Sequence, residues 1–373
     1  MITPSTATRA TRSGPLAGLR VIEFAGLGPA PFACMMLSDM GAEVVTIDRP
    51  SRRPSGPDDI TGRGRTLVLA DLKNPQDRDR VLQLIEGADI LIEGFRPGVM
   101  ERLGLGPDAA LSRNKRLVYG RMTGWGQSGP LAQAAGHDLN YIAITGALDA
   151  IGPAHGAPVP PLNLVGDYGG GALYLVAGVL AALHEAGRSG VGQVVDAAIV
   201  DGVASLLSLL VSHEQRGILS ERRGNNVLDG GAPYYAVYQT ADARYISLGS
   251  IEPAFFAKFC ELTGLNPSWR DAQHDRAHWP ALHAEIAKLF LKQPQAYWTS
   301  LLEGTDACFA PVLSLGEARK HGHMIARGTT QVLDGVPHPA PAPRFSRTRS
   351  SIQCTAPTQP VSLDAALEAW ASP

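Results

Sequence analysis

Two short glycine-rich segments each carry a group that can transfer a proton. The first reads Gly-His-Asp-Leu-Asn-Tyr and contains His137 and Asp138. The second reads Leu-Val-Gly-Asp-Tyr-Gly-Gly-Gly and contains Asp167, just before an apolar stretch. A histidine and a carboxylate that face each other across a small site can remove a proton from one side of a carbon atom and return one to the other side. The two segments therefore predict acid–base chemistry.

Each of these residues also has a plain structural interpretation. An isolated histidine is more often a hydrogen-bonded structural residue than a base, although the glycine-flanked turn around His137 strengthens the functional interpretation. Asp167 could simply cap the helix that follows it. Three consecutive glycines are a poor start for a helix, because each costs about 1 kcal/mol relative to alanine. A functional role is therefore favoured for Asp167.

Other charged residues suggest a ligand less directly. Glu252 follows an apolar strand and precedes Pro253, where it could open a helix. The sequence alone does not place Glu252 near His137. Basic residues gather in the N-terminal third of the chain, at Arg49, Arg52, Arg53, Arg63, Arg65, Arg96 and Arg102. This cluster suits a polyanionic ligand tail and suits a solvated basic face equally well.

Composition narrows the class of protein. The 373 residues allow two or three structural units, and 45% hydrophobic with 18% charged residues indicates a packed globular protein. A net charge of −2 offers no footprint for nucleic acid. No uninterrupted apolar run reaches the roughly 18–20 residues of a membrane span, so we expect no membrane partner.

Cysteine and histidine spacings indicate neither disulfides nor metal. The four cysteines lie far apart and form no C-x-x-C pair, which predicts a reducing, cytoplasmic compartment. Two histidine pairs, His274 with His278 and His321 with His323, lack the H-E-x-x-H pattern of a zinc site. We therefore expect no metal site.

Apolar runs predict an α/β protein with a Rossmann-like parallel sheet. Short apolar strands alternate with helices, which indicates a sheet covered on both faces. The expected strands are residues 19–24, 43–47, 66–70, 90–93, 117–121 and 192–197. A long helix over 199–216 follows, and a hairpin over 236–240 and 245–249 opens a smaller α+β domain.

These patterns predict five segments along the chain. They are a disordered extension at 1–13, a large Rossmann-like domain at 14–200, a linker at 201–231, a small α+β domain at 232–330 and a C-terminal segment at 331–373 that returns to the large domain. The turn after the first strand contains Gly26 and Gly28, and Asp48 ends the next strand, as in dinucleotide-binding proteins. Pro31 replaces the third glycine of that motif, which argues against NAD binding.

Ordered motifs from about Gly14 to Arg349 carry a family resemblance. They include Pro-Leu-Ala-Gly-Leu-Arg-Val from Pro15, Ile-Asp-Arg-Pro from Ile47, Ala-Asp-Leu-Lys from Ala70, Glu-Gly-Phe-Arg-Pro-Gly from Glu93, Arg-Met-Thr-Gly-Trp-Gly-Gln from Arg121, Gly-His-Asp from Gly136, Gly-Asp from Gly166, Leu-Asp-Gly-Gly-Ala-Pro-Tyr-Tyr from Leu228 and Ile-Glu-Pro from Ile251. With these motifs the chain resembles the family III CoA-transferase superfamily and, within it, the α-methylacyl-CoA racemases.

The resemblance implies a fold, an activity and a set of site residues. It implies the family III CoA-transferase fold, an interlocked homodimer and an isomerase of lipid metabolism that racemises acyl-CoA thioesters. His137 and Asp167 match the acid/base pair, Asp138 matches the residue whose backbone holds the thioester oxygen, and Glu252 matches a partner-subunit residue that supports the histidine. Coenzyme A, as part of the substrate and without a further cofactor, would lie in the large domain along Arg49, Ala70, Lys73, Arg96, Arg102 and Tyr141.

Two other functions remain to be weighed. Transferases of the same superfamily use the aspartate that matches Asp167 as a nucleophile and form an aspartyl-CoA thioester. They commonly carry a glycine-rich loop in the small domain and need no histidine at position 137. Here the corresponding stretch reads Gly-Ser-Ile-Glu and ends at Glu252, which favours racemisation. A non-catalytic acyl-CoA or nucleotide-binding protein would have no reason to hold His137, Asp167 and Glu252 together.

Overall fold

The computed structural model describes residues 12–371 and divides the chain into two compact units. Among the described residues, unit 1 comprises 12–145, Leu162–Leu206 and 322–371, and unit 2 comprises Gly146–Pro161 and Leu207–His321. Three boundaries thus differ from those expected. Residues 146–161 group with unit 2, 201–206 group with unit 1, and the return to unit 1 begins at Gly322.

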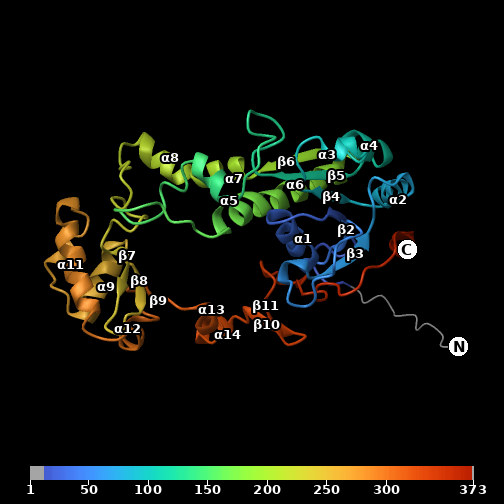
Figure 1. The fold of residues 1–373 in the computed structure, drawn as a ribbon. Helices are drawn as coiled ribbons and strands as arrows, with labels where there is room; N and C mark the ends of the chain where they lie inside the picture. Colours follow the sequence, from blue (N-terminus) through green and yellow to red (C-terminus); the bar gives the residue numbers. More distant parts are fainter. Residues whose placement is uncertain (1–11, 372–373) are drawn as a thin grey trace. The chain divides into compact units, whose positions relative to one another are not determined.

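A six-stranded parallel sheet forms the centre of unit 1 (Figure 1). Its strand order is β3-β2-β1-β4-β5-β6, the order of doubly wound dinucleotide-binding sheets, so the predicted Rossmann-like sheet is confirmed. The strands are β1 Arg20–Phe24, β2 Glu43–Asp48, β3 Arg65–Leu69, β4 Ile90–Glu93, β5 Val118–Thr123 and β6 Val194–Ala198.

Helices cover both faces of this sheet because successive strand residues point to opposite sides. On one face Ile22, Val45 and Val68 pack in a single buried cluster with the helices α2, α4 and α15. On the other face α1 and α6 pack against the strands. The helices of unit 1 outside the site are α1 Pro29–Asp39, α2 Pro75–Glu86, α3 Val99–Arg102, α4 Pro107–Arg113, α14 Gly322–Ala326 and α15 Leu363–Ala371, with a 3-10 turn at Ile60–Gly62. The short helix α13 Leu315–Ala318 belongs to unit 2.

The two ends of the described chain are fixed to unit 1. Arg12 donates to Ala42 O (2.8 Å) and Ser13 Oγ bonds Ser351 Oγ (2.9 Å), so the expected disorder of residues 1–13 is wrong for these two residues. Residues 1–11 lie outside the described residues. The C-terminal part adds the hairpin β10 Thr330–Leu333 and β11 Val336–Pro339, and buried Arg63 donates to Pro339 O (2.8 Å).

The candidate site of unit 1 lies on a group of packed helical segments. They are α5 Asp138–Ile144, a π-helix at Leu164–Ala172 that continues into α6 Leu173–Ser189, and α7 Ile199–Leu206. By length and composition alone, the stretch Leu164–Ser189 could cross a membrane. In the fold Leu175 and Val179 of this stretch are buried and lie against the backbone of Gly120 in β5.

The expected long helix over 199–216 is wrong at Leu207. The chain forms α7 up to Leu206 and then α8 Ser208–Gln215, and the boundary between the two units falls at the break. The amphipathic pattern runs across both helices without a proline or glycine at the break, so periodicity alone carries no signal for it.

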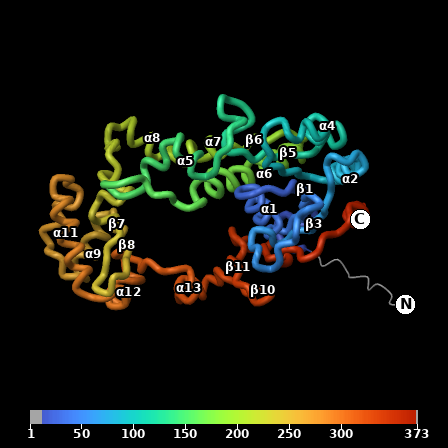
Figure 2. Tube along the Cα trace, viewed as in Figure 1, coloured from blue at the N-terminus to red at the C-terminus, as the bar shows by residue number. Residues whose placement is uncertain are grey.

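Unit 2 is a small α+β unit, as predicted. The strands β7 Tyr235–Gln239, β8 Tyr245–Gly249 and β9 Phe309–Pro311 form an antiparallel sheet in the order β7-β8-β9. Its core is aromatic, with Tyr234, Phe256, Phe290 and Trp298 all buried. The helices are α9 Pro253–Thr263, α10 Trp269–Ala272, α11 Trp279–Phe290 and α12 Gln295–Leu302, and Figure 2 traces the chain through them.

Residues 217–231 of the segment expected as a linker form an ordered, hydrogen-bonded loop of unit 2. Asp229 accepts hydrogen bonds from Gly224 N and from Asn226 N (both 2.9 Å). Arg223, only 11% exposed, donates to the backbone oxygens of Asp149 (2.5 Å), Pro153 (3.0 Å) and Gly156 (3.0 Å). Arg223 thus clamps residues 146–161, the excursion loop that joins α5 to the π-helix.

Arg223→Ala is expected to lower the free energy of unfolding by about 1–3 kcal/mol, because three backbone oxygens lose a charged donor. Urea denaturation measures the change, with the exposed neighbour Arg222→Ala as the matched control. Equal stability of the two variants would show that the clamp contributes nothing.

Candidate active site

Basic residues line the carboxyl-terminal edge of the parallel sheet. Arg49 follows β2, Lys73 follows β3 and Arg96 follows β4, and all three side chains are exposed. Ala70 directly follows β3 and is buried, and Arg102 lies on α3 just after β4. Ligands of open α/β sheets bind outside this edge. The fold therefore gathers the five predicted CoA-binding positions of the sheet along one edge.

A cavity of about 450 Å³ lies at the ends of β4 and β5, within the size range of small-molecule sites. Among its lining residues are His137, Arg96 and Tyr141, three residues singled out in the sequence. His137 is exposed, directly precedes α5, and donates its backbone N–H to Asn140 Oδ1 (3.0 Å). The start of α5 thus holds His137 at the wall of this cavity.

Two glycines make room for Tyr141. A Cβ at Gly124 would overlap with the Tyr141 ring, and one at Gly136 would meet Tyr141 Cε1 (2.8 Å) and Trp125 Cζ2 (2.9 Å). Tyr141 OH donates to Gly136 O, and the Trp125 and Tyr141 rings meet edge to face with centroids 4.7 Å apart. Gly136 therefore accommodates aromatic side chains.

Asp167 lies inside a π-helix, so the alternative interpretation as a plain helix cap does not apply. The π-helix begins at Leu164, and Tyr168 N donates to Asn163 O (3.1 Å), the i to i−5 bond of this helix type. The glycines after Asp167 allow close packing: a Cβ at Gly170 would meet Val203 Cγ2 (2.5 Å) of α7, and one at Gly171 would meet Pro29 Cβ (3.1 Å) of α1. π-Helical turns occur frequently at functional sites.

The Asp138 carboxylate connects the two catalytic segments. Its Oδ2 accepts a hydrogen bond from the backbone N–H of Asp167 (2.6 Å), while its Oδ1 is buried without a hydrogen-bond partner. A Cβ at Gly166 would overlap with Asp138 Oδ2, so only glycine allows this approach. The side chain of Asp138, which follows His137 in the sequence, therefore accepts a hydrogen bond from the backbone of Asp167.

Asp167 has the ionisation behaviour of an acid/base residue. Its pKa is raised from 3.8 to about 6, first by burial and then by the negative charge of Asp138, while His137 acts in the opposite direction. The interaction places His137 and Asp138 in the electrostatic surroundings of Asp167. An acid or base works best when its pKa lies near the working pH.

The turn that resembled a dinucleotide motif lies beside Asp167. Gly28 has φ of +70°, and a Cβ there would meet Asp167 Oδ2 (2.7 Å), so glycine is required twice over. Pro29 and Pro31 remove two N–H donors from the first turn of α1, where a dinucleotide phosphate would bind. Gly28 and Asp167 lie far apart along the chain, so local sequence pattern carries no signal that they are neighbours.

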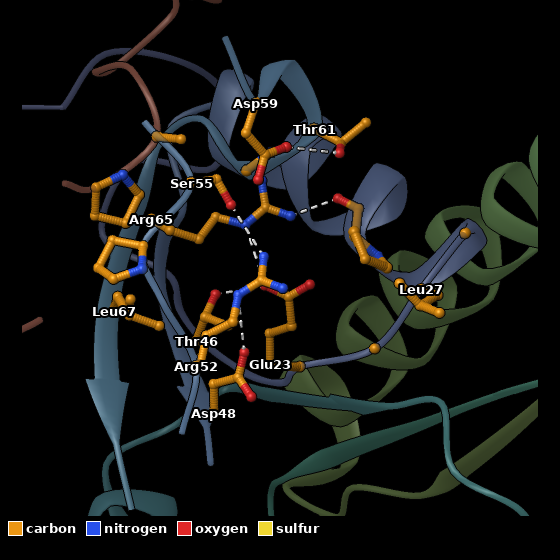
Figure 3. A pocket seen from close by; sticks show the side chains of 18 of the residues that line it. Glu23, Leu27, Thr46, Asp48, Arg52, Ser55, Asp59, Thr61, Arg65 and Leu67 are labelled. Atoms are coloured by element: carbon orange, nitrogen blue, oxygen red, sulfur yellow. Dashed lines mark hydrogen bonds and ion pairs between the residues drawn. The ribbon is translucent and has the colours of Figure 1, made fainter. Parts of the chain in front are cut away.

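Ion pairs inside unit 1 use several of the clustered arginines. A second cavity of about 360 Å³ lies beside α1, and Figure 3 shows its acidic and basic side chains pointing toward one another. Arg65 is buried and bonds Glu23 (3.1 Å), and Arg52 pairs with Asp48 (3.5 Å). Arg63 is also buried, against Asp39 (2.5 Å). Arg63 and Arg65 therefore stabilise the fold and are not available to a polyanionic ligand.

Glu252 lies in unit 2, whereas His137 and Asp167 lie in unit 1. Glu252 is exposed, directly precedes α9, and accepts at its backbone oxygen from Phe256 N (3.0 Å). Its support of the histidine stays a prediction. Among residues 12–371, no group of three or more His, Cys, Asp or Glu residues is arranged to hold a metal ion.

Asp167→Asn is expected to stabilise the protein above pH 6. The folded-state pKa of Asp167 is raised, so native protein binds a proton that the unfolded chain releases, and stability falls as pH rises from about 4 through 6. After allowance for partial exposure the gain at pH 8 is about 1–2 kcal/mol.

Denaturation curves at pH 4 and pH 8 measure this gain, with exposed Asp58→Asn as the matched control. A gain of the same size at both pH values would contradict the raised pKa.

Comparisons with known proteins identify the family of the chain. The family model described as CoA-transferase family III matches residues 16–359. A mouse protein named alpha-methylacyl-CoA racemase is 43% identical over 89% of this chain and 87% of its own length, and its human counterpart is 41% identical over 87% and 86%. A CAIB/BAIF family protein from Brucella suis has a solved structure with a TM-score of 0.82 at 24% identity, covering 96% of this chain and 99% of its own. The chain therefore belongs to CoA-transferase family III.

Proposed function

We propose that the protein is a racemase that interconverts (2R)- and (2S)-2-methylacyl-CoA thioesters by 1,1-proton transfer through an enolate. The observation that carries this proposal is the proximity of His137 to an Asp167 whose pKa is raised to about 6. The likeness to the mouse and human proteins named alpha-methylacyl-CoA racemase supports the substrate class.

Two opposed groups are what the reaction needs. A proton α to a thioester carbonyl is only weakly acidic, so its removal requires a base within hydrogen-bonding reach. In the proposed reaction neutral His137 takes the proton from the S epimer, and protonated Asp167 delivers one to the opposite face. The R epimer uses the same pair with the roles reversed. A raised pKa lets Asp167 serve as acid or base near neutral pH.

The start of α5 would stabilise the enolate. Asp138 is the first residue of α5, so its backbone N–H has no partner within the helix. A donor aimed at the developing negative charge on a thioester oxygen lowers the barrier, and removing one such donor typically costs about 10²–10³ in rate. The backbone of Asp138, next to the proposed base His137, would thereby supply the hydrogen-bond donor for the thioester oxygen.

The basic edge of the sheet would bind the CoA portion. Arg49, Lys73 and Arg96 are exposed at the ends of neighbouring and nearby strands, where their charges can attract phosphates. Arg96 also lines the cavity with His137 and so connects the CoA edge to the reacting carbon.

A CoA-transferase is the second candidate, because the family also includes CoA-transferases. In that reaction Asp167 would act as a nucleophile, which requires an ionised carboxylate. With a pKa of about 6, Asp167 is mostly ionised at pH 7, so its ionisation fits either reaction. The observation that favours the racemase is His137 at the cavity wall, for which a transferase has no use.

We also infer that the protein acts as a homodimer. Large apolar side chains around the catalytic segments of unit 1 are exposed, namely Leu139, Ile144, Leu162, Leu164 and Leu206. Exposed apolar groups of this kind mark interaction surfaces. The expected mass in solution is twice the 39.4 kDa of the chain, measured by light scattering, and Leu162→Glu with Leu164→Glu should shift it to the monomer. A monomeric mass for the unchanged protein would contradict the inference.

His137→Ala and Asp167→Ala are each expected to abolish epimerisation, because each removes one of the two proton-transfer groups. The loss is about 10²–10⁴-fold. Incubation with (2S)-2-methylacyl-CoA without any acid acceptor, followed by chiral analysis of the thioester, measures it. His184→Ala and Asp58→Ala, at exposed positions outside the cavity, are the matched controls. Labelling of Asp167 by acyl-CoA that hydroxylamine reverses, without epimerisation, would favour the transferase instead.

Arg96→Ala is expected to raise KM for the thioester about tenfold, because one charged contact to CoA is lost. The effect should shrink with increasing salt, since screening weakens the contact in the unchanged protein. Arg116 is an exposed arginine directly before β5, at the opposite edge of the sheet, so Arg116→Ala is the matched control. Equal KM values for the two variants would place CoA elsewhere.

A further inference from the structure

One carboxylate joins the two segments that carry the proton-transfer groups. Asp138 follows His137 directly, and its Oδ2 accepts the backbone N–H of Asp167 at 2.6 Å. A hydrogen bond to an ionised acceptor is about twice as strong as a neutral one. This bond holds the π-helix against the start of α5 at the position of the catalytic aspartate itself.

The neighbouring backbone is shaped around this bond. Gly166 is buried, and a Cβ at that position would overlap with Asp138 Oδ2 and also meet Ile142 Cγ2 (3.0 Å). Any larger residue at position 166 would push Asp138 away from the Asp167 N–H. The glycine therefore preserves one specific contact between side chain and backbone.

The other oxygen of Asp138 has no partner. Its Oδ1 is buried without a hydrogen bond, so neither a cation nor a donor among the described residues neutralises the carboxylate at that atom. Uncompensated buried polar atoms are rare in folded proteins and often mark a functional requirement. Here the unneutralised charge stands next to Asp167.

We propose that the Asp138 side chain is a positioning residue that fixes Asp167 opposite His137 and favours the protonated form of the Asp167 carboxyl. This role is additional to the backbone N–H of Asp138 and rests on the proposed racemase function. The carboxylate oxygen of Asp138 fixes the position of Asp167, and the negative charge of Asp138 favours the protonated form of Asp167.

Among the titratable groups around Asp167, Asp138 favours the protonated form of the Asp167 carboxyl. The titratable groups that face Asp167 are His137, Asp138 and Tyr141, all from α5 and its start. The π-helix packs on α7 through Val203 and on α1 through Pro29, neither of which titrates. Of these groups Asp138 is the one whose negative charge favours protonation of Asp167, whereas His137 acts in the opposite direction.

Two substitutions separate position from charge. Asp138→Asn keeps an oxygen that can accept from Asp167 N–H but removes the charge. Without the charge Asp167 loses its proton at lower pH, so the acid limb of the kcat/KM profile should move down by about one pH unit in both directions of epimerisation. Asp138→Ala should show the same shift and, in addition, lower kcat by about 10–100-fold with little change in KM, because Asp167 is no longer held in place.

Gly166→Ala tests the contact from the other side. It keeps the Asp138 charge but displaces its oxygen, so kcat should fall as in Asp138→Ala. Circular dichroism and thermal denaturation establish that each variant is folded before its kinetics are compared.

A direct titration separates this proposal from the proposed function. Selective ¹³C labelling of aspartate carboxyls, with Asp167→Asn to assign the signal, reports the Asp167 titration by NMR in unchanged protein and in Asp138→Asn. A lower midpoint in Asp138→Asn supports the role of Asp138 even if the unchanged protein shows no epimerisation, which would overturn only the racemase proposal. Identical midpoints together with superimposable pH profiles would overturn the role of Asp138.

Discussion

The site depends on the close approach of backbones around the π-helix. Glycines at 166, 170 and 171 bring this helix into contact with α5, α7 and α1 at distances that no Cβ would allow. Gly28 does the same from the turn after β1. Because four segments converge without side chains between them, the carboxyl of Asp167 is partly buried, and burial is the largest cause of its raised pKa. The same close packing of the backbone segments therefore also raises the pKa of Asp167.

The parallel sheet supplies the second requirement. Strands that run in one direction bring their following loops to a single edge, so Arg49, Lys73 and Arg96 gather although they lie far apart in the chain. The same edge carries His137 on the loop after β5. A long anionic CoA portion and a small reacting carbon can then be held by separate residues of one surface. Unit 2 adds Arg223, which clamps the excursion loop between α5 and the π-helix.

Much of the fold could be predicted from local pattern. The expected strand at 90–93 matches β4, that at 43–47 is one residue shorter than β2, and that at 66–70 is shifted by one residue from β3. Buried parallel strands are short apolar runs with clear limits. The π-helix could not be predicted, since no local signal distinguishes i to i−5 bonding. The same holds for the Asp138 bond to Asp167, which joins residues distant in sequence. Arg63 and Arg65 looked like ligand contacts because composition does not reveal burial.

The central claim is that two different groups act on opposite faces of one carbon. Its most direct test follows the hydrogen at C2 during early turnover of (2S)-2-methylacyl-CoA in D₂O, with mass spectrometry of the separated epimers. The account predicts that the R product carries deuterium from its first appearance, because Asp167 delivers a solvent-derived proton while His137 removes the original one. An R product that retains the substrate hydrogen would show that a single group transfers it, and would contradict the account.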